Sequence, residues 1–184
     1  MNYTELQVTT NFSFLRGASH PEELVEQAAA YGYESIAITD KNTFAGIVRG
    51  HVAAKKLGIR IIPACRLDLI DGPSLLAFPT DKNAYSQLSS LLTTGNLRAE
   101  KGECHLYKAD VYAHSKGTKF AVIPPAILNE SFDYDGSFKK AFKEYRDELG
   151  DHLYIAATRS YCGDDAKLLH RIYQLSCQAK VPML

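Results

Sequence analysis

Polar side chains that follow short apolar runs are the residues of this sequence best suited to chemistry. Because active sites of α/β folds form at the carboxyl ends of strands, these side chains are expected to gather at one edge of a sheet. They are Gln7, Thr9, Thr10 and Asn11 after the first run, Asp40 and Lys41 after the second, Arg66 within the third, and Thr158 and Arg159 after the sixth.

Asp40 is the strongest single candidate, because a carboxylate at a strand end can bind a divalent cation or act as a general base. Two structural interpretations compete with that role. Asp40 can cap a helix that starts near Asn42, or it can pair with Lys41 or Arg66. One carboxylate among cations makes a poor cation site, so the structural interpretations are favoured.

Motifs with a known chemical mechanism are absent from the sequence. The chain has no phosphate-binding GxxxxGK[ST] or GxGxxG, no GxSxG nucleophile turn and no HExxH zinc motif. Glu103, Cys104 and His105 are metal-ligand types, but adjacent residues rarely chelate one tetrahedral ion, so we expect no metal there. The Phe and Tyr positions match helix faces, which favours core packing over base stacking.

The composition is that of one globular domain. The 184 residues carry 21 Lys and Arg against 21 Asp and Glu, which disfavours a free-standing nucleic-acid binder but not a part of a larger DNA-handling protein. No membrane span or signal peptide is evident, so we expect a cytoplasmic protein without membrane contact. The scattered cysteines are expected to be free thiols: Cys65, Cys104, Cys162 and Cys177.

Short apolar runs alternate with amphipathic helical segments along the whole chain. Ser19 and Glu22 have capping-box spacing before the first helix, and a second helix is expected over 42–57, with Val48 and Val52 on its apolar face. The runs 59–69 and 74–78 are predicted to form a hairpin. The remaining segments are read as strands at 35–39, 119–123 and 153–157, with helices starting near 21, 81, 108, 138 and 164. This order predicts an α/β fold with a mainly parallel sheet or barrel.

Several stretches carry a resemblance to a known family. They are Asn11–Leu24, Ala37–Asp40, Ala45–Gly46, His51–Arg60, Lys101–Leu106 and Val181–Leu184. The chain resembles the N-terminal polymerase and histidinol phosphatase (PHP) domain of error-prone bacterial class C DNA polymerases, which are similar to the DNA polymerase III alpha subunit. The resemblance implies a distorted seven-stranded (β/α) barrel over residues 1–184, truncated within or before its last strand–helix unit.

The resemblance also implies a site, from which this sequence departs. Active members bind a cluster of metal ions at the strand ends, where the metals activate water for phosphoester hydrolysis. The family's His-x-His motif falls on Gln7 and Thr9, its Asp-His motif on Asp40 and Lys41, and a later Glu on Arg66. A late carboxylate falls near Ala156, and the terminal Asp-x-His motif has no counterpart before Leu184.

These departures predict that the family metals, Zn, Mn or Mg, are lost. A protonated Lys and an Arg offer no lone pair, and their fixed charges would repel a metal ion. We therefore expect a metal-free cavity at Gln7, Thr9, Asp40, Lys41 and Arg66, without catalytic residues. In it, Lys41 and Arg66 are expected to pair with Asp40.

The implied function is a non-catalytic scaffold or interaction domain of an error-prone, translesion DNA polymerase. The parent chain would be a DNA-directed DNA polymerase, a nucleotidyltransferase acting in DNA replication and in repair after DNA damage. Its partners would be the rest of the polymerase chain, DNA through that chain, and proteins of the replication machinery. One alternative is a metal-dependent phosphoesterase or 3′–5′ exonuclease with an atypical site. Another is a metabolic barrel enzyme for a small anion, supported by Lys41 and Arg66.

Overall fold

The computed structural model describes residues 3–184 and shows two small sheets, each with its own helices. In the first sheet the strands β1 (Glu5–Val8), β2 (Ser35–Ile38) and β3 (Arg60–Pro63) are parallel and lie in that order. The second sheet has the order β4 (Cys65–Leu67), β5 (Leu75–Pro79), β6 (Thr118–Val122) and β7 (Leu153–Ile155). There β5 is antiparallel to both neighbours and β6 is parallel to β7.

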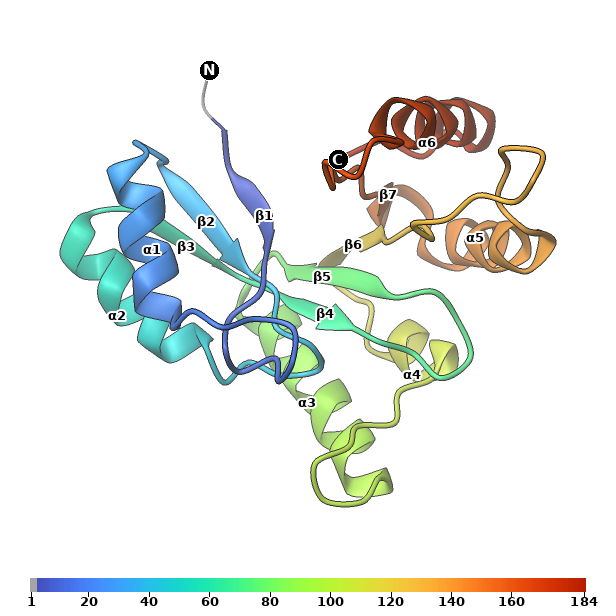
Figure 1. Cartoon of the computed structure of the whole chain (residues 1–184). Helices are drawn as coiled ribbons and strands as arrows, with labels where there is room; N and C mark the ends of the chain where they lie inside the picture. Colours follow the sequence, from blue (N-terminus) through green and yellow to red (C-terminus); the bar gives the residue numbers. More distant parts are fainter. Residues whose placement is uncertain (1–2) are drawn as a thin grey trace.

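Helices cover the two sheets on separate sides (Figure 1). Beside the first sheet lie α1 (Pro21–Ala30) and α2 (Ile47–Leu57). The second sheet packs against α3 (Lys82–Arg98), α4 (Lys108–Ala113), α5 (Gly136–Leu149) and α6 (Asp165–Ala179). A 3₁₀ turn, Gly150–His152, leads into β7. The predicted mixed α/β class and the hairpin of β4 with β5 are confirmed.

The two sheets are joined at the ends of β2 and β4. Lys41 and Arg66 form a parallel bridge, in which the Arg66 amide donates to the Asp40 carbonyl and the Asn42 amide donates to the Arg66 carbonyl. The long predicted run 59–69 divides at Ala64, so β3 and β4 belong to different sheets. This junction brings the ends of strands from both sheets to one place.

The barrel is open on one side. Beyond β7, Met183 forms a parallel bridge with Ile155. The Ile155 amide donates to the Pro182 carbonyl, and the Leu184 amide donates to the Ile155 carbonyl. The predicted strand at Val181 therefore pairs with β7. Within residues 3–184, β1 has a strand partner only on the β2 side, which fits a truncated barrel.

Two local expectations were wrong. The helix α1 is capped at His20, whose amide donates to Glu23, so the capping box lies one residue after the predicted pair Ser19 and Glu22. The helix α2 begins at Ile47 rather than near Asn42, and Val48 faces solvent with 71% of its surface exposed. Gly50 takes the inward position, because a Cβ there would lie 2.5 Å from the Cδ1 atom of Ile38.

Most of the buried apolar surface belongs to the second sheet. Its core combines Leu67 and Leu75 from the hairpin with Phe120 of β6, Phe142 and Tyr145 of α5. A smaller cluster, which includes Val25 and Ile36, lies between the first sheet and its two helices. The junction between the sheets lies between these two cores and carries the polar residues described next.

Candidate functional site

Asp40, two residues after the end of β2, is a buried carboxylate held by neutral donors. Only 1% of its surface is exposed. Its Oδ1 accepts hydrogen bonds from the Thr10 amide (2.8 Å) and the Ser13 hydroxyl (2.7 Å), and its Oδ2 accepts one from the Thr10 hydroxyl (2.8 Å). The predicted pairing of Asp40 with Lys41 and Arg66 is therefore wrong. The capping alternative fails as well, because no helix starts before Ile47 in this segment.

Close backbone packing fixes the donors around Asp40. The loop after β1 turns back on itself at Gly17, where a Cβ would lie 2.3 Å from the Thr10 carbonyl oxygen. At Gly46 a Cβ would lie 2.7 Å from Oδ2 of Asp40. Ser13 also accepts a hydrogen bond from the Lys41 amide (2.9 Å), so the loops after β1 and β2 are tied together.

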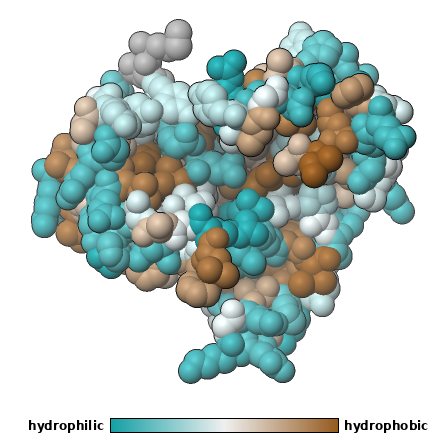
Figure 2. All heavy atoms as spheres, viewed as in Figure 1, coloured by the Kyte–Doolittle hydropathy of each residue, from teal (hydrophilic) through white to brown (hydrophobic). Residues whose placement is uncertain are grey.

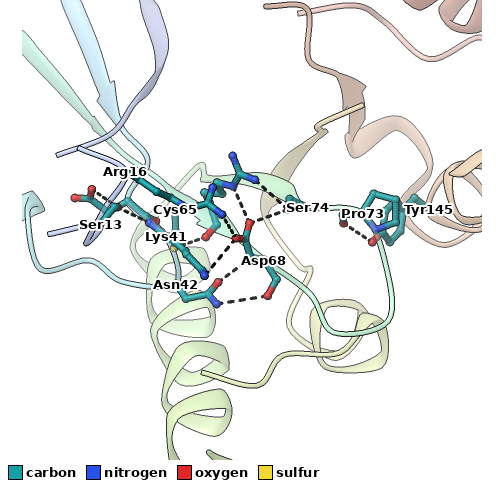
Figure 3. A network of polar contacts seen from close by, with 11 residues as sticks. Ser13, Arg16, Lys41, Asn42, Cys65, Asp68, Pro73, Ser74 and Tyr145 are labelled. Atoms are coloured by element: carbon teal, nitrogen blue, oxygen red, sulfur yellow. Dashed lines mark hydrogen bonds and ion pairs between the residues drawn. The ribbon is translucent and has the colours of Figure 1, made fainter. Parts of the chain in front are cut away.

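The cations that were expected at Asp40 surround Asp68 instead (Figure 3). Arg66 Nε lies 2.7 Å from Oδ1 of Asp68, Arg16 lies 3.2 Å from Oδ2, and Lys41 Nζ lies 3.7 Å from Oδ2. Ser74 adds a hydrogen bond of 2.7 Å to Oδ1. We call Asp68 with Arg16, Lys41 and Arg66 the Asp68 cluster.

The electrostatics of the Asp68 cluster favour the ionised carboxylate. Burial alone would raise the pKa of Asp68, but hydrogen bonds from Arg66 and Ser74 and the charges of Arg66 and Arg16 outweigh it. The pKa of Asp68 is therefore lowered from its ordinary value. One signal for this cluster is present in the sequence, since Arg66 and Asp68 are two residues apart and lie on one face of an extended chain.

The other predicted site positions are placed differently. Gln7 accepts a hydrogen bond from Thr158 (3.2 Å), which joins the ends of β1 and β7. Thr10 binds Asp40, whereas Asn11 contacts the His20 ring (2.9 Å). Ala156 is buried against Leu76 and Ala121, and the Thr9 carbonyl packs against Gly17. Arg159 lies close to Asp165.

The described residues do not fit a metal cluster. In the range 3–184 no group of three or more His, Cys, Asp or Glu side chains is placed to hold a metal ion. The oxygens of Asp40 already accept three hydrogen bonds, and Asp68 lies among three cations. Glu103 contacts His105 at 3.0 Å, but with Cys104 they form no such group.

A cavity of about 770 Å³ opens beside the Asp68 cluster. Its lining is part apolar and part charged, with Phe12, Phe14 and Ile70 on one hand and Lys41 and Asp68 on the other. The acidic Glu100 and Glu103 and the basic Lys101 complete a rim of both signs. The cavity therefore offers a mixed surface rather than a cation-selective or anion-selective site.

Curated relatives of this chain are polymerases. The chain is 46% identical to an error-prone DNA polymerase of Caulobacter vibrioides over 99% of its residues, and 41% identical to error-prone DNA polymerase 2 of Agrobacterium fabrum over 98%. In both cases it spans only 16% of the relative's length.

The fold also has counterparts among solved structures. An amidohydrolase from Chromobacterium violaceum matches 98% of this chain and 84% of its own with a TM-score of 0.67 at 14% identity, a likeness of fold. No helix in residues 3–184 is long and apolar enough to cross a membrane. The family model described as "PHP domain" matches residues 5–160, and from this match the chain belongs to the PHP domain family.

Proposed function

We propose that this chain is the N-terminal PHP domain of an error-prone, translesion DNA polymerase and serves there as a metal-free, non-catalytic scaffold. The parent chain would act in DNA replication and repair of damaged template in the cytoplasm. It would bind DNA through its polymerase portion and contact other replication proteins. The high identity to polymerases of which this chain spans 16% supports the placement in a longer polymerase.

The observation that carries the non-catalytic role is the Asp68 cluster. Three cations lie within 3.7 Å of one carboxylate at the strand ends, where Lys41 and Arg66 stand in place of ligands. Lys and Arg cannot ligate a metal ion in their charged forms. The second carboxylate, Asp40, has both oxygens engaged by Thr10 and Ser13. Such a donor set supports a structural use of this end of the barrel.

The test is metal loading followed by a hydrolysis assay. The protein is stripped with a chelator, reloaded with Zn²⁺ or Mn²⁺, and assayed for bound metal and for release of nucleotides from a labelled oligonucleotide 3′ end. We expect no stoichiometric metal and no metal-dependent hydrolysis. Stoichiometric metal together with hydrolysis that is lost in Asp40→Asn and kept in the exposed-carboxylate control Asp151→Asn would contradict the scaffold role and support an atypical exonuclease.

A further inference from the structure

The loop between β1 and α1 presents two large apolar side chains to solvent. Phe14 is 85% exposed and Leu15 is 89% exposed, although the Phe positions were expected in the core. Figure 2 shows brown, apolar atoms over this loop beside teal, polar ones in the middle of the viewed face. An apolar patch rimmed by polar residues is typical of an interaction site. We call Phe14 and Leu15 the apolar tip.

Backbone hydrogen bonds close the loop around the apolar tip. Ser13 accepts hydrogen bonds from the amides of Arg16 (2.9 Å) and Gly17 (3.1 Å), and the Asn11 amide donates to the Ser19 carbonyl (2.9 Å) at the base of the loop. Leu15 has a φ of 60°, a left-handed conformation that is costly for a residue with a Cβ atom. A strained residue persists where the surroundings determine it and often marks a functional position.

The surroundings of the apolar tip restrict what can bind there. Arg16 follows the tip in the sequence, and Lys41 lines the same cavity as Phe14. Both cations are half-exposed and share the carboxylate of Asp68. Carboxylates of a partner would balance the positive charge of these two cations that Asp68 leaves uncompensated. The adjoining cavity does not decide between carboxylates and phosphates, because Glu100 and Glu103 line it together with Lys101. The balanced charge of the chain, 21 cations against 21 anions, disfavours single-stranded DNA as the partner.

We propose that the apolar tip docks into an apolar pocket rimmed by carboxylates in the polymerase portion of the same chain. This inference rests on the proposed function, since it requires a longer polymerase. In the relative from Caulobacter vibrioides, the matching segment makes up 16% of the whole chain. Two side chains bury far less than the area of roughly 1,200 Å² that a stable complex of separate proteins needs. A tethered partner at high effective concentration can use so small a contact.

The direct test places p-benzoylphenylalanine at position 14 of the full-length polymerase and irradiates the protein without and with DNA. We expect an intramolecular cross-link to an apolar peptide with acidic neighbours outside residues 1–184. The control carries the photoreactive residue at Ile127, which is equally exposed in another loop, and should form far less of this product. A cross-link to DNA alone, a cross-link to a second copy, or none at position 14 would each overturn the proposal.

A second variant separates docking from loop structure. Leu15→Asn suits the left-handed backbone better than Leu does, so by itself it should keep or strengthen the loop. In the full-length chain we nevertheless expect hydrogen exchange of residues 12–16 to become about tenfold faster, because a docking side chain is lost. Unchanged or slower exchange would overturn the proposal. Neither measurement involves metal, so a positive metal-loading test would refute the scaffold role without altering these results.

Discussion

At the scale of single residues, the buried Asp40 and the half-buried Asp68 have different partners at the strand ends. Asp40 binds neutral donors and holds the loop after β1, whereas Asp68 binds cations from three segments of the chain. The difference follows from geometry, since the Lys41 side chain reaches Asp68 while its amide bonds to Ser13. Removing either carboxylate would leave its partners unsatisfied, in a fully buried place at Asp40 and in a half-buried one at Asp68.

Replacing Asp68 by Asn should destabilise the protein by about 1–3 kcal/mol, because Arg16, Lys41 and Arg66 would lose the carboxylate that they share. Chemical denaturation at neutral pH measures this change. The exposed-carboxylate variant Asp151→Asn is the control and should stay within about 0.5 kcal/mol of the parent. An Asp68→Asn variant with the same free energy of unfolding as the parent would contradict the ionic role of Asp68.

The ionised Asp68 carboxylate should also make the stability of the protein depend on pH. The pKa of Asp68 is lowered in the folded protein, so the unfolded chain binds its proton first as the pH falls. The stabilisation by Asp68 is thus complete above the unfolded pKa of about 4 and is lost as the pH falls through the folded value. Denaturation midpoints from pH 6 to pH 3 should decline less in Asp68→Asn than in the parent. Equal slopes would contradict this assignment.

At the scale of elements, small residues decide which loop and helix positions can approach the sheets. Gly17 lets the loop after β1 pass against the Thr10 carbonyl, and Gly50 lets α2 approach β2. Apolar periodicity predicted where helices occur, but it placed Val48 inward, because periodicity does not show that a glycine marks the closest contact. The register of α2 therefore depends on packing that a pattern of apolar residues does not encode.

Gly17→Ala should displace the loop after β1 and lower stability by about 1–3 kcal/mol, because the added Cβ would meet backbone atoms that have little freedom to move. Gly136→Ala is the matched control, because no atom lies within 4 Å of its added Cβ at the start of α5. The control should be neutral or slightly stabilising. Thermal unfolding compares the two, and equal midpoints would refute the close approach at Gly17.

How far the sequence predicted this structure depends on the range of the interactions. The local features, such as the Asp81 cap of α3 and the hairpin of β4 with β5, follow from short-range patterns and were predicted correctly. The partner of Lys41 was not predicted, because Asp68 lies near Lys41 only once the bridge between the two sheets has formed. Short-range sequence patterns do not encode that long-range contact. Ser13 escaped notice because a lone serine in a loop has no distinctive spacing.

At the scale of the whole molecule, the open side of the barrel lies between β1 and the final strand segment. Only Met183 and its neighbours extend the sheet beyond β7, and within residues 3–184 the outer edge of β1 has no strand against it. An uncovered strand edge offers unpaired backbone groups to any further strand. The balanced charge of 21 cations and 21 anions fits a domain that supports others rather than one that binds DNA alone.

In the longer polymerase proposed above, β1 should gain a strand neighbour from later in the chain. Amides of β1 and of the segment 181–184 are then expected to exchange more slowly in the full chain than in the 184-residue piece. Amides in β5, which already has a strand on each side, should be nearly unchanged and serve as the control. Equal rates at β1 in both proteins would argue that the barrel stays open.

The contact of Gln7 with Thr158 spans 151 positions of sequence and sets an order of events during synthesis. At about 5–20 residues per second, a ribosome needs roughly 8–30 s to deliver the second partner after the first. Throughout that interval β1 is a nascent edge with nothing on its far side. Glu5 and Gln7, the polar residues of this short strand, are placed to hinder its pairing with other nascent chains while that edge is uncovered.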